Sequence, residues 1–135
     1  MSTITKFEDL HIWQLARLQV TDFNKLREVT SLGNDFPLRN QMNSSSGSVM
    51  DCIAEGFDRS GNAEFKHFLL IAKGSNAEYR SQLYRCLDRK HLNNHEFNEL
   101  FRKNVILGNK IMAMISYLQK ANFKGQRFKS NESST

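Results

Sequence analysis

The strongest constraint on the fold lies between residues 97 and 118, where apolar side chains recur at helical spacing on two stripes. Members of the first stripe are three, four or seven residues apart: Phe97, Leu100, Leu107, Ile111, Met114 and Leu118. Gly108 interrupts the second stripe, which consists of Phe101, Val105, Met112 and Ile115. One stripe is enough to face the chain's own core, and a second leaves apolar surface that a small monomer has difficulty burying. The pattern therefore predicts a helical bundle whose second stripe is an oligomer interface.

Apolar periodicity divides the 135 residues into four helical segments. Strict alternation of apolar and polar residues is missing, so no sheet is expected. We expect the first helix to run from about Lys6 to Thr30, with Thr5 and Glu8 as a capping box at its start. The second is expected to begin at Pro37, the single proline of the chain, because proline fits the first helical turn.

The third and fourth segments follow polar turns. The third is expected after residues 60–62, where Asn62 is a candidate cap. The fourth is expected after residues 92–94, with Asn93 and Glu96 as a capping pair, and it should end near Asn122. Short connections favour antiparallel neighbours, so we expect an all-α fold, an up-down-up-down left-handed four-helix bundle. Residues 1–122 would form this domain, and residues 123–135 a flexible, polar and basic tail.

The second helical segment has a heptad seam of unusually small residues: Leu38, Met42, Ser45, Val49, Cys52 and Gly56. Residues 43–48 have poor helix propensity, but the seam runs through them in phase and favours a helix over a loop. Small residues there would let a neighbouring helix approach closely. We expect the same of Gly74, which lies in the middle of the third segment and costs about 1 kcal/mol relative to alanine.

Composition excludes several classes of protein. No run approaches the roughly 18 apolar residues of a membrane span, and residues 1–6 lack the apolar run of a secretion signal, so a cytoplasmic location is expected. Cys52 and Cys86 do not form a C-x-x-C pair, so we expect buried thiols rather than a zinc or redox site.

Basic residues recur every seven positions in and before the third segment: Arg59, Lys66, Lys73 and Arg80. The net charge of +5 is compatible with an anionic partner. Spaced cations neutralise successive phosphates without reading sequence, so this basic row is a candidate nucleic-acid-binding site. The alternative is a solvated face paired with nearby acids. One such acid is Glu78, and Glu55 with Arg59 forms a separate i, i+4 acid–base pair.

Two E-x-x-H patterns, Glu8/His11 and Glu64/His67, have the spacing of ligands in di-iron bundles. Both lie off the predicted inward helix faces, so no metal or other cofactor is expected. No motif of nucleophilic catalysis or phosphate binding occurs. We therefore expect no catalytic residue, no enzyme activity and no small-molecule substrate.

Several short motifs, in order, resemble one family: Phe7, Leu10, Trp13 and Ala16; Phe36-Pro37; Gln41-Met42; Ser48-Val49; Ile53-Ala54-Glu55-Gly56 and Arg59; Glu64-Phe65, Phe68-Leu69, Ile71-Ala72, Gly74-Ser75 and Glu78. Over residues 7–118 the chain is similar to the S23-like proteins, which are encoded in intervening sequences of bacterial 23S ribosomal RNA. Asn43 and Ser44 depart from the family, because many members have two basic residues there.

The resemblance implies a left-handed antiparallel four-helix bundle without catalytic activity. It also implies similarity to the accessory protein of diversity-generating retroelements, a homopentamer that binds nucleic acid. The motif residues Ile53, Ala54, Glu55, Gly56, Gly74 and Ser75 are then candidate family-specific positions. We expect a non-enzymatic, self-assembling bundle, a pentamer that binds RNA or DNA through basic surface. The alternatives are a protein-interaction scaffold without nucleic-acid binding and a metal-dependent bundle enzyme.

Overall fold

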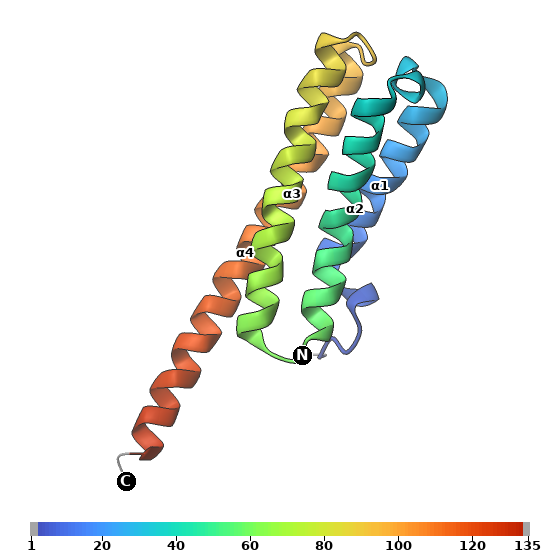
Figure 1. Ribbon diagram of the computed structural model, residues 1–135. Coiled ribbons are helices and arrows are strands. Elements are labelled where there is room, and N and C mark those ends of the chain that lie inside the picture. Colours follow the sequence, from blue (N-terminus) through green and yellow to red (C-terminus); the bar gives the residue numbers. More distant parts are fainter. Residues whose placement is uncertain (1–2, 134–135) are drawn as a thin grey trace.

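The computed structural model describes the backbone of residues 3–133 and the side chains of residues 3–121. Its four long helices are α1 (His11–Val29), α2 (Phe36–Asp58), α3 (Asn62–Asp88) and α4 (Asn94–Ser133). Two short 3-10 helices, η1 (Phe7–Asp9) and η2 (Ser31–Asn34), lie before α1 and between α1 and α2. No strand occurs in residues 3–133. Successive helices run in opposite directions (Figure 1). The prediction of an all-α four-helix bundle is confirmed, and its hand stays a prediction.

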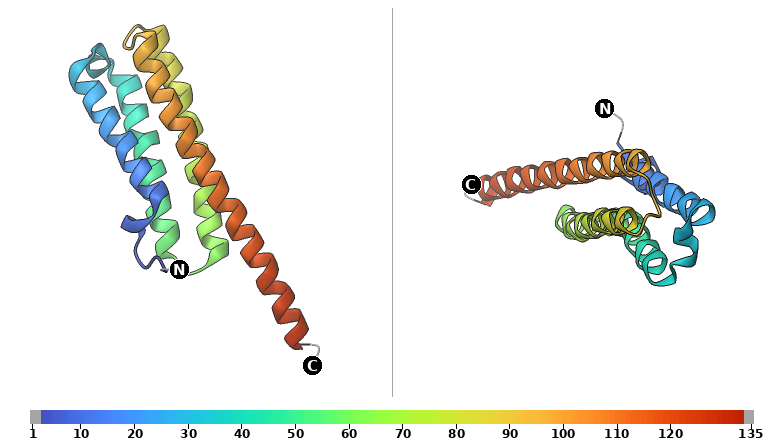
Figure 2. Two further views of the ribbon diagram at one scale, coloured as in Figure 1. Left: turned by 180° about the vertical axis from the view of Figure 1, so that it is seen from behind. Right: turned by 90° about the horizontal axis from the view of Figure 1, so that it is seen from above.

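The helices form a four-membered ring in the order α1, α2, α3, α4, as the end-on view in Figure 2 shows. The contact between α2 and α3 is the most extensive, followed by that between α3 and α4, and the contact between α1 and α4 is the smallest of the four. Because α3 stands between α2 and α4, the outer sides of α2 and α4 are separate surfaces. The last part of α4 extends past the end of the bundle (Figure 1).

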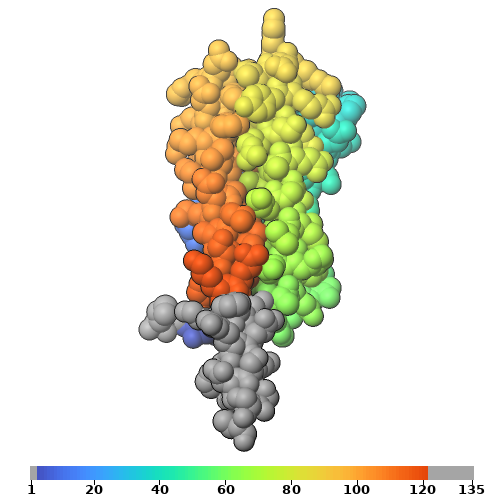
Figure 3. All heavy atoms as spheres, turned by 90° about the vertical axis from the view of Figure 1, so that its left-hand side faces the viewer, coloured from blue at the N-terminus to red at the C-terminus, as the bar shows by residue number. Residues whose placement is uncertain are grey.

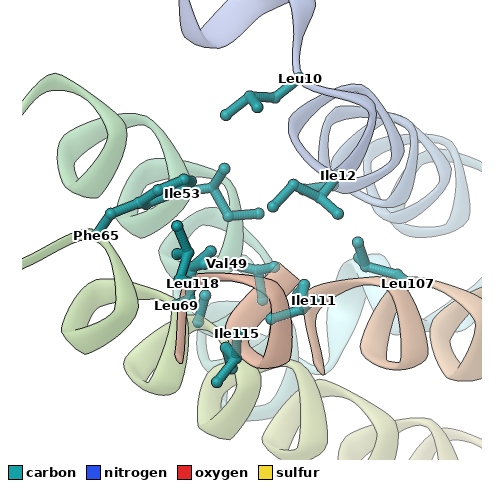
Figure 4. Close-up of a cluster of buried hydrophobic side chains, with 12 residues drawn as sticks. Leu10, Ile12, Val49, Ile53, Phe65, Leu69, Leu107, Ile111, Ile115 and Leu118 are labelled. Atoms are coloured by element: carbon teal, nitrogen blue, oxygen red, sulfur yellow. The ribbon is translucent and has the colours of Figure 1, made fainter. Parts of the chain in front are cut away.

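The interior contains two apolar clusters separated by a polar layer. The cluster nearer the chain's N-terminus, drawn in Figure 4, includes Val49, Ile53, Leu69, Leu107, Ile111 and Ile115. The other includes Phe23, Leu38, Met42, Tyr79, Leu83 and Cys86. The buried polar side chains of the described residues are Gln19 of α1, Ser45 and Ser46 of α2, Asn76 and Gln82 of α3, and Asn104 of α4, and every helix thus contributes to the polar layer. Satisfied buried polar groups disfavour other registers of the helices, since a slipped helix would leave them unpaired.

The predicted structure of the second helix is confirmed. Asp35 caps α2 by accepting a hydrogen bond from the Leu38 amide at 3.5 Å, and Pro37 lies in the first turn. Residues 43–48 are helical. At Gly56 α3 approaches α2 closely, because a Cβ atom built there would lie 2.5 Å from the Cβ of Phe68. The small seam therefore allows the close contact of α2 with α3.

The predicted cap of the fourth helix is also confirmed. The amide of Asn93 donates to Glu96 Oε1 at 3.0 Å, and the amide of Glu96 donates to Asn93 Oδ1 at 2.8 Å. This reciprocal pair satisfies two amides that the first helical turn leaves free. The helix then continues through 123–133, so the expected helix end near Asn122 is wrong. None of the helices in the described chain combines the length and apolarity needed to cross a bilayer.

Three further local expectations are wrong. The capping box of Thr5 and Glu8 does not form: the chain makes the 3-10 turn η1, which carries no side-chain cap, and α1 starts only at His11. Phe7 packs edge-on against Trp13, with ring centroids 5.2 Å apart, and this contact fixes the turn. Asn62 is the first residue of α3 and not its cap. Gly74 permits no close crossing, because a Cβ atom there would meet nothing within 4 Å.

Candidate interface on the α3–α4 face

The second apolar stripe of α4 is divided between the core and the surface. Ile115 is 1% exposed and belongs to the core cluster of the subunit, so its place in the predicted oligomer interface is wrong. It lies one turn after Ile111 and therefore on the inner side of α4. Phe101 is half-buried against Phe97 and Tyr84, with ring centroids 5.5 and 5.7 Å away. Val105 is half-buried and Met112 is 42% exposed.

Val105 and Met112 line a groove between α3 and α4 with a volume of about 450 Å³. We call it the α3–α4 groove; the face on which it lies is turned to the viewer in Figure 3. The side chains that α3 contributes are Leu70, Lys73, Asn76, Ala77 and Arg80. The groove thus joins two residues of the predicted oligomer interface with two of the predicted basic row. Half of each predicted site therefore lies on one shared surface.

The outer side of α3 carries a heptad seam of its own. Apolar and basic residues alternate along it at spacings of three and four: Leu70, Lys73, Ala77, Arg80 and Tyr84. Leu70 and Tyr84 are each 48% exposed. A seam with this spacing is the pattern by which one helix packs along another. Sequence reasoning noted only the seven-residue repeat of the cations and missed the apolar residues between them.

The polar layer fixes one wall of the groove. Asn104 donates from Nδ2 to Gln19 Oε1 at 2.9 Å and to Asn76 Oδ1 at 3.0 Å, and Asn76 Nδ2 donates to the Asn104 carbonyl at 3.1 Å. Arg80 donates to Asn104 Oδ1 at 3.5 Å, so its guanidinium is tied to this layer. Gly108 lets α4 approach, because a Cβ there would lie 3.1 Å from Asn76 Nδ2.

The basic row does not form one continuous site. Arg59 is the residue that follows α2, where it pairs with Glu55 at 2.9 Å and lies over the ring of Phe68 at 5.2 Å. Both side chains of this ion pair are about half exposed. The predicted i, i+4 pair of Glu55 and Arg59 is therefore a surface ion pair. Lys66 is half-buried on α3. Lys73 and Arg80 therefore share the groove, and Arg59 belongs to a different surface.

The family-motif residues have different structural roles. Ile53 is fully buried in the core, Gly56 provides the close contact with α3, and Ala54 is half-buried. Ser75 lies 2.9 Å from Ser48, hydroxyl to hydroxyl, and so links α3 to α2. Gly74 is exposed and lies at the α3–α4 groove. Most of the motif therefore maintains the packing of α2 on α3.

Four polar side chains form a hydrogen-bonded group at the end of the bundle opposite the N-terminus, which we call the clasp: Ser31, Asp35, Arg89 and His91. Sequence reasoning did not predict it. Asp35 accepts hydrogen bonds from His91 Nε2 at 2.9 Å and from Arg89 at 2.8 Å, and His91 Nδ1 lies 2.6 Å from the Ser31 hydroxyl. The His91 hydrogen bond, then that of Arg89, lowers the pKa of Asp35 to about 2. Since Asp35 also caps α2, the clasp ties the α1–α2 connection to the turn before α4. The residues are 54 to 60 positions apart, and only their placement in polar turns was visible in the sequence.

The remaining reactive groups do not form a site. Burial raises the pKa of the Cys86 thiol to about 12, while Cys52 is only half-buried. Burial also raises the pKa of Tyr79, whose hydroxyl has no hydrogen-bond partner in the described residues. His11 and His67, with the glutamates of their motifs, are exposed. Within the described part of the chain, no three His, Cys, Asp or Glu side chains group as a metal site requires.

Comparison with known proteins agrees with the motifs in α1 to α3. No curated protein matches the chain. The family model of the 23S rRNA-intervening sequence protein matches residues 8–116, which include α1, α2, α3 and the part of α4 that lines the groove. The chain therefore belongs to the family of 23S rRNA-intervening sequence proteins.

Proposed function

We propose that this protein is a non-enzymatic helical bundle that assembles with copies of itself through the α3–α4 groove. The observation that supports this is the outward heptad seam of α3 beside Val105 and Met112, which leaves Leu70, Tyr84 and Met112 between 42% and 48% exposed. Grouped apolar side chains on the surface of a small protein mark an interaction site. Five subunits is the number that the family resemblance implies.

Light scattering at micromolar concentration tests the assembly. We expect a multiple of the 15.6 kDa subunit mass for the unchanged protein. Met112→Lys places a charge in the groove without touching the core and should reduce that mass. Asn24→Lys adds the same single charge at an exposed position of α1 and is the matched control, which should leave the mass unchanged. A mass of 15.6 kDa for the unchanged protein at every concentration would reject the proposal.

Binding of RNA or DNA is a second candidate function, which the free cations of α3 favour. Lys66 and Lys73 make no ion pair with any residue of the described chain. Lys66, Lys73 and Arg80 follow one another at about 10 Å intervals along the helix, at 1.5 Å per residue. Such a row would contact phosphates and bind with an affinity that falls as salt rises.

Fluorescence anisotropy with labelled RNA over a range of salt concentrations tests this function. Replacing Lys66, Lys73 and Arg80 by alanine should lower the salt slope by up to about 0.7 for each phosphate that these side chains no longer neutralise. Adding Arg59→Ala should change nothing further, because Arg59 lies elsewhere. The control replaces Arg17, Lys25 and Arg27 of α1, which removes the same charge. Equal slopes for the two triple variants would dismiss the α3 row as the binding site.

A further inference from the structure

We infer that the element which enters the α3–α4 groove of one subunit is the outer face of α2 of the next subunit. This inference rests on the proposed self-assembly and names the surface that meets the groove. The starting point is the charge of the groove. Lys73 has no ion-pair partner in the described chain, and Arg80 reaches only the neutral side chain of Asn104. An occupant that buries these cations must bring acids, since unpaired buried charges are costly.

The outer face of α2 carries acids at the matching spacing. Asp51 and Asp58 are exposed and seven residues apart, as are Lys73 and Arg80, so each pair spans about 10 Å of its helix. Neither aspartate forms an ion pair with any residue that the structure describes. One face thus presents two unpaired cations and the other two unpaired anions at equal separation. Complementary charges of this kind fix which surfaces meet and in what register.

Apolar contact accompanies the charges on both faces. Asp51 and Asp58 border a hollow of about 500 Å³ together with Phe7 of η1, Ala54 and the mutually paired Glu55 and Arg59, whose charges offset each other. Further along α2, the outer face passes through Gly47, where an added Cβ would meet nothing within 4 Å. A helix with short side chains there can approach the larger residues that project from the groove, such as Leu70 and Met112.

The two faces lie on different sides of the subunit, because α3 separates α2 from α4 in the ring (Figure 2). One subunit can therefore offer its groove to one neighbour and its α2 face to another. A contact between unlike faces is heterologous, and it produces a closed ring when the rotation closes. A contact of like faces gives even-numbered, two-fold assemblies. The unlike faces thus suit an odd subunit number such as five.

Charge reversal tests this pairing of faces. The groove variant is Lys73→Glu with Arg80→Glu, the α2 variant is Asp51→Lys with Asp58→Lys, and the third variant carries all four changes. Sedimentation velocity should show subunits of 15.6 kDa for each double variant and the assembly mass of the unchanged protein for the fourfold variant. Equal amounts of the two double variants should associate when mixed. Arg17→Glu with Lys25→Glu, on the exposed side of α1, is the control and should assemble.

The outcomes separate this inference from the proposed function. If the groove variant dissociates and the fourfold variant stays dissociated while circular dichroism shows both folded, another face enters the groove and the inference fails alone. If the groove variant loses RNA binding but keeps its assembly mass, nucleic acid occupies the groove and the inference also fails. If the unchanged protein is a monomer, both this inference and the proposed self-assembly fail.

Discussion

The two sides of α4 carry similar residues in different surroundings. On the inner side, Leu107, Ile111 and Ile115 are at most 1% exposed, because they meet side chains from all three other helices (Figure 4). On the outer side, Met112 is 42% exposed and lines the α3–α4 groove beside the outward seam of α3. Apolar character alone therefore does not say what a side chain of this helix contacts. The inner side stabilises the subunit, and by our account the outer side binds the next one.

The largest expected effect comes from truncating neighbouring residues on opposite sides of α4. Ile111→Ala removes a fully buried side chain and should lower the free energy of unfolding by about 2–5 kcal/mol. Met112→Ala should change the stability of the dilute subunit by less than about 0.5 kcal/mol. Urea unfolding, at a concentration below that of assembly, measures both. Similar losses for the two variants would show that the sides do not differ.

A second test of the difference between the inner and outer sides of α4 compares two of its asparagines, Asn104 in the polar layer and Asn109 at the surface. Asn104→Ala removes the hydrogen bonds that Asn104 Nδ2 donates to Gln19 Oε1 and Asn76 Oδ1 in the core, which leaves Gln19 Oε1 without a donor, and it should cost about 1–3 kcal/mol. Asn109 is exposed at the groove, so Asn109→Ala should cost little. Urea unfolding again compares the variants. A loss for Asn109→Ala as large as that for Asn104→Ala would contradict the assignment of the layer to the interior.

Two glycines extend the comparison to α2 and α3. In Gly56→Ala the new methyl group meets the Cβ of Phe68, which cannot move without its backbone, so we expect a loss of about 1–3 kcal/mol. In Gly74→Ala the methyl group enters open space on a helix, so we expect a gain of up to about 1 kcal/mol. Thermal melting points give the signs. A stabilising Gly56→Ala would mean that α2 and α3 are further apart than described.

The smallest effect concerns the clasp before α4 and its dependence on pH. The pKa of Asp35 is lower in the folded chain, about 2, than the ordinary value of 3.8. The carboxylate therefore stabilises the fold above about pH 4, and this contribution disappears as the pH falls towards about 2. Arg89 is 44% exposed, so we expect about 1 kcal/mol or less. The melting points of the unchanged protein and Asp35→Asn should converge on acidification, and a constant difference would contradict the clasp.

Sequence reasoning predicted the helices and their core positions more accurately than it predicted which residues are exposed. Periodicity was sufficient for four helices and for the core positions Leu107, Ile111 and Leu118, because their spacing repeats the helical turn. It wrongly assigned Ile115 to the oligomer interface. For a residue at the edge of the apolar face, a small rotation of the helix about its axis decides whether the side chain points into the core or toward solvent. The polar layer and the clasp depend on pairs such as Gln19 with Asn104, which are 85 residues apart. Such pairs become visible only when the helices are placed together.

The most direct measurement of our central claim is the rate of thiol labelling at Met112→Cys as a function of protein concentration. If the outer side of α4 is covered by another subunit, the labelling rate falls as the protein concentration rises into the range where the mass increases. Glu28→Cys, on the exposed side of α1, should label at the same rate throughout. A Met112→Cys thiol that labels equally fast in dilute and concentrated solution would contradict the claim.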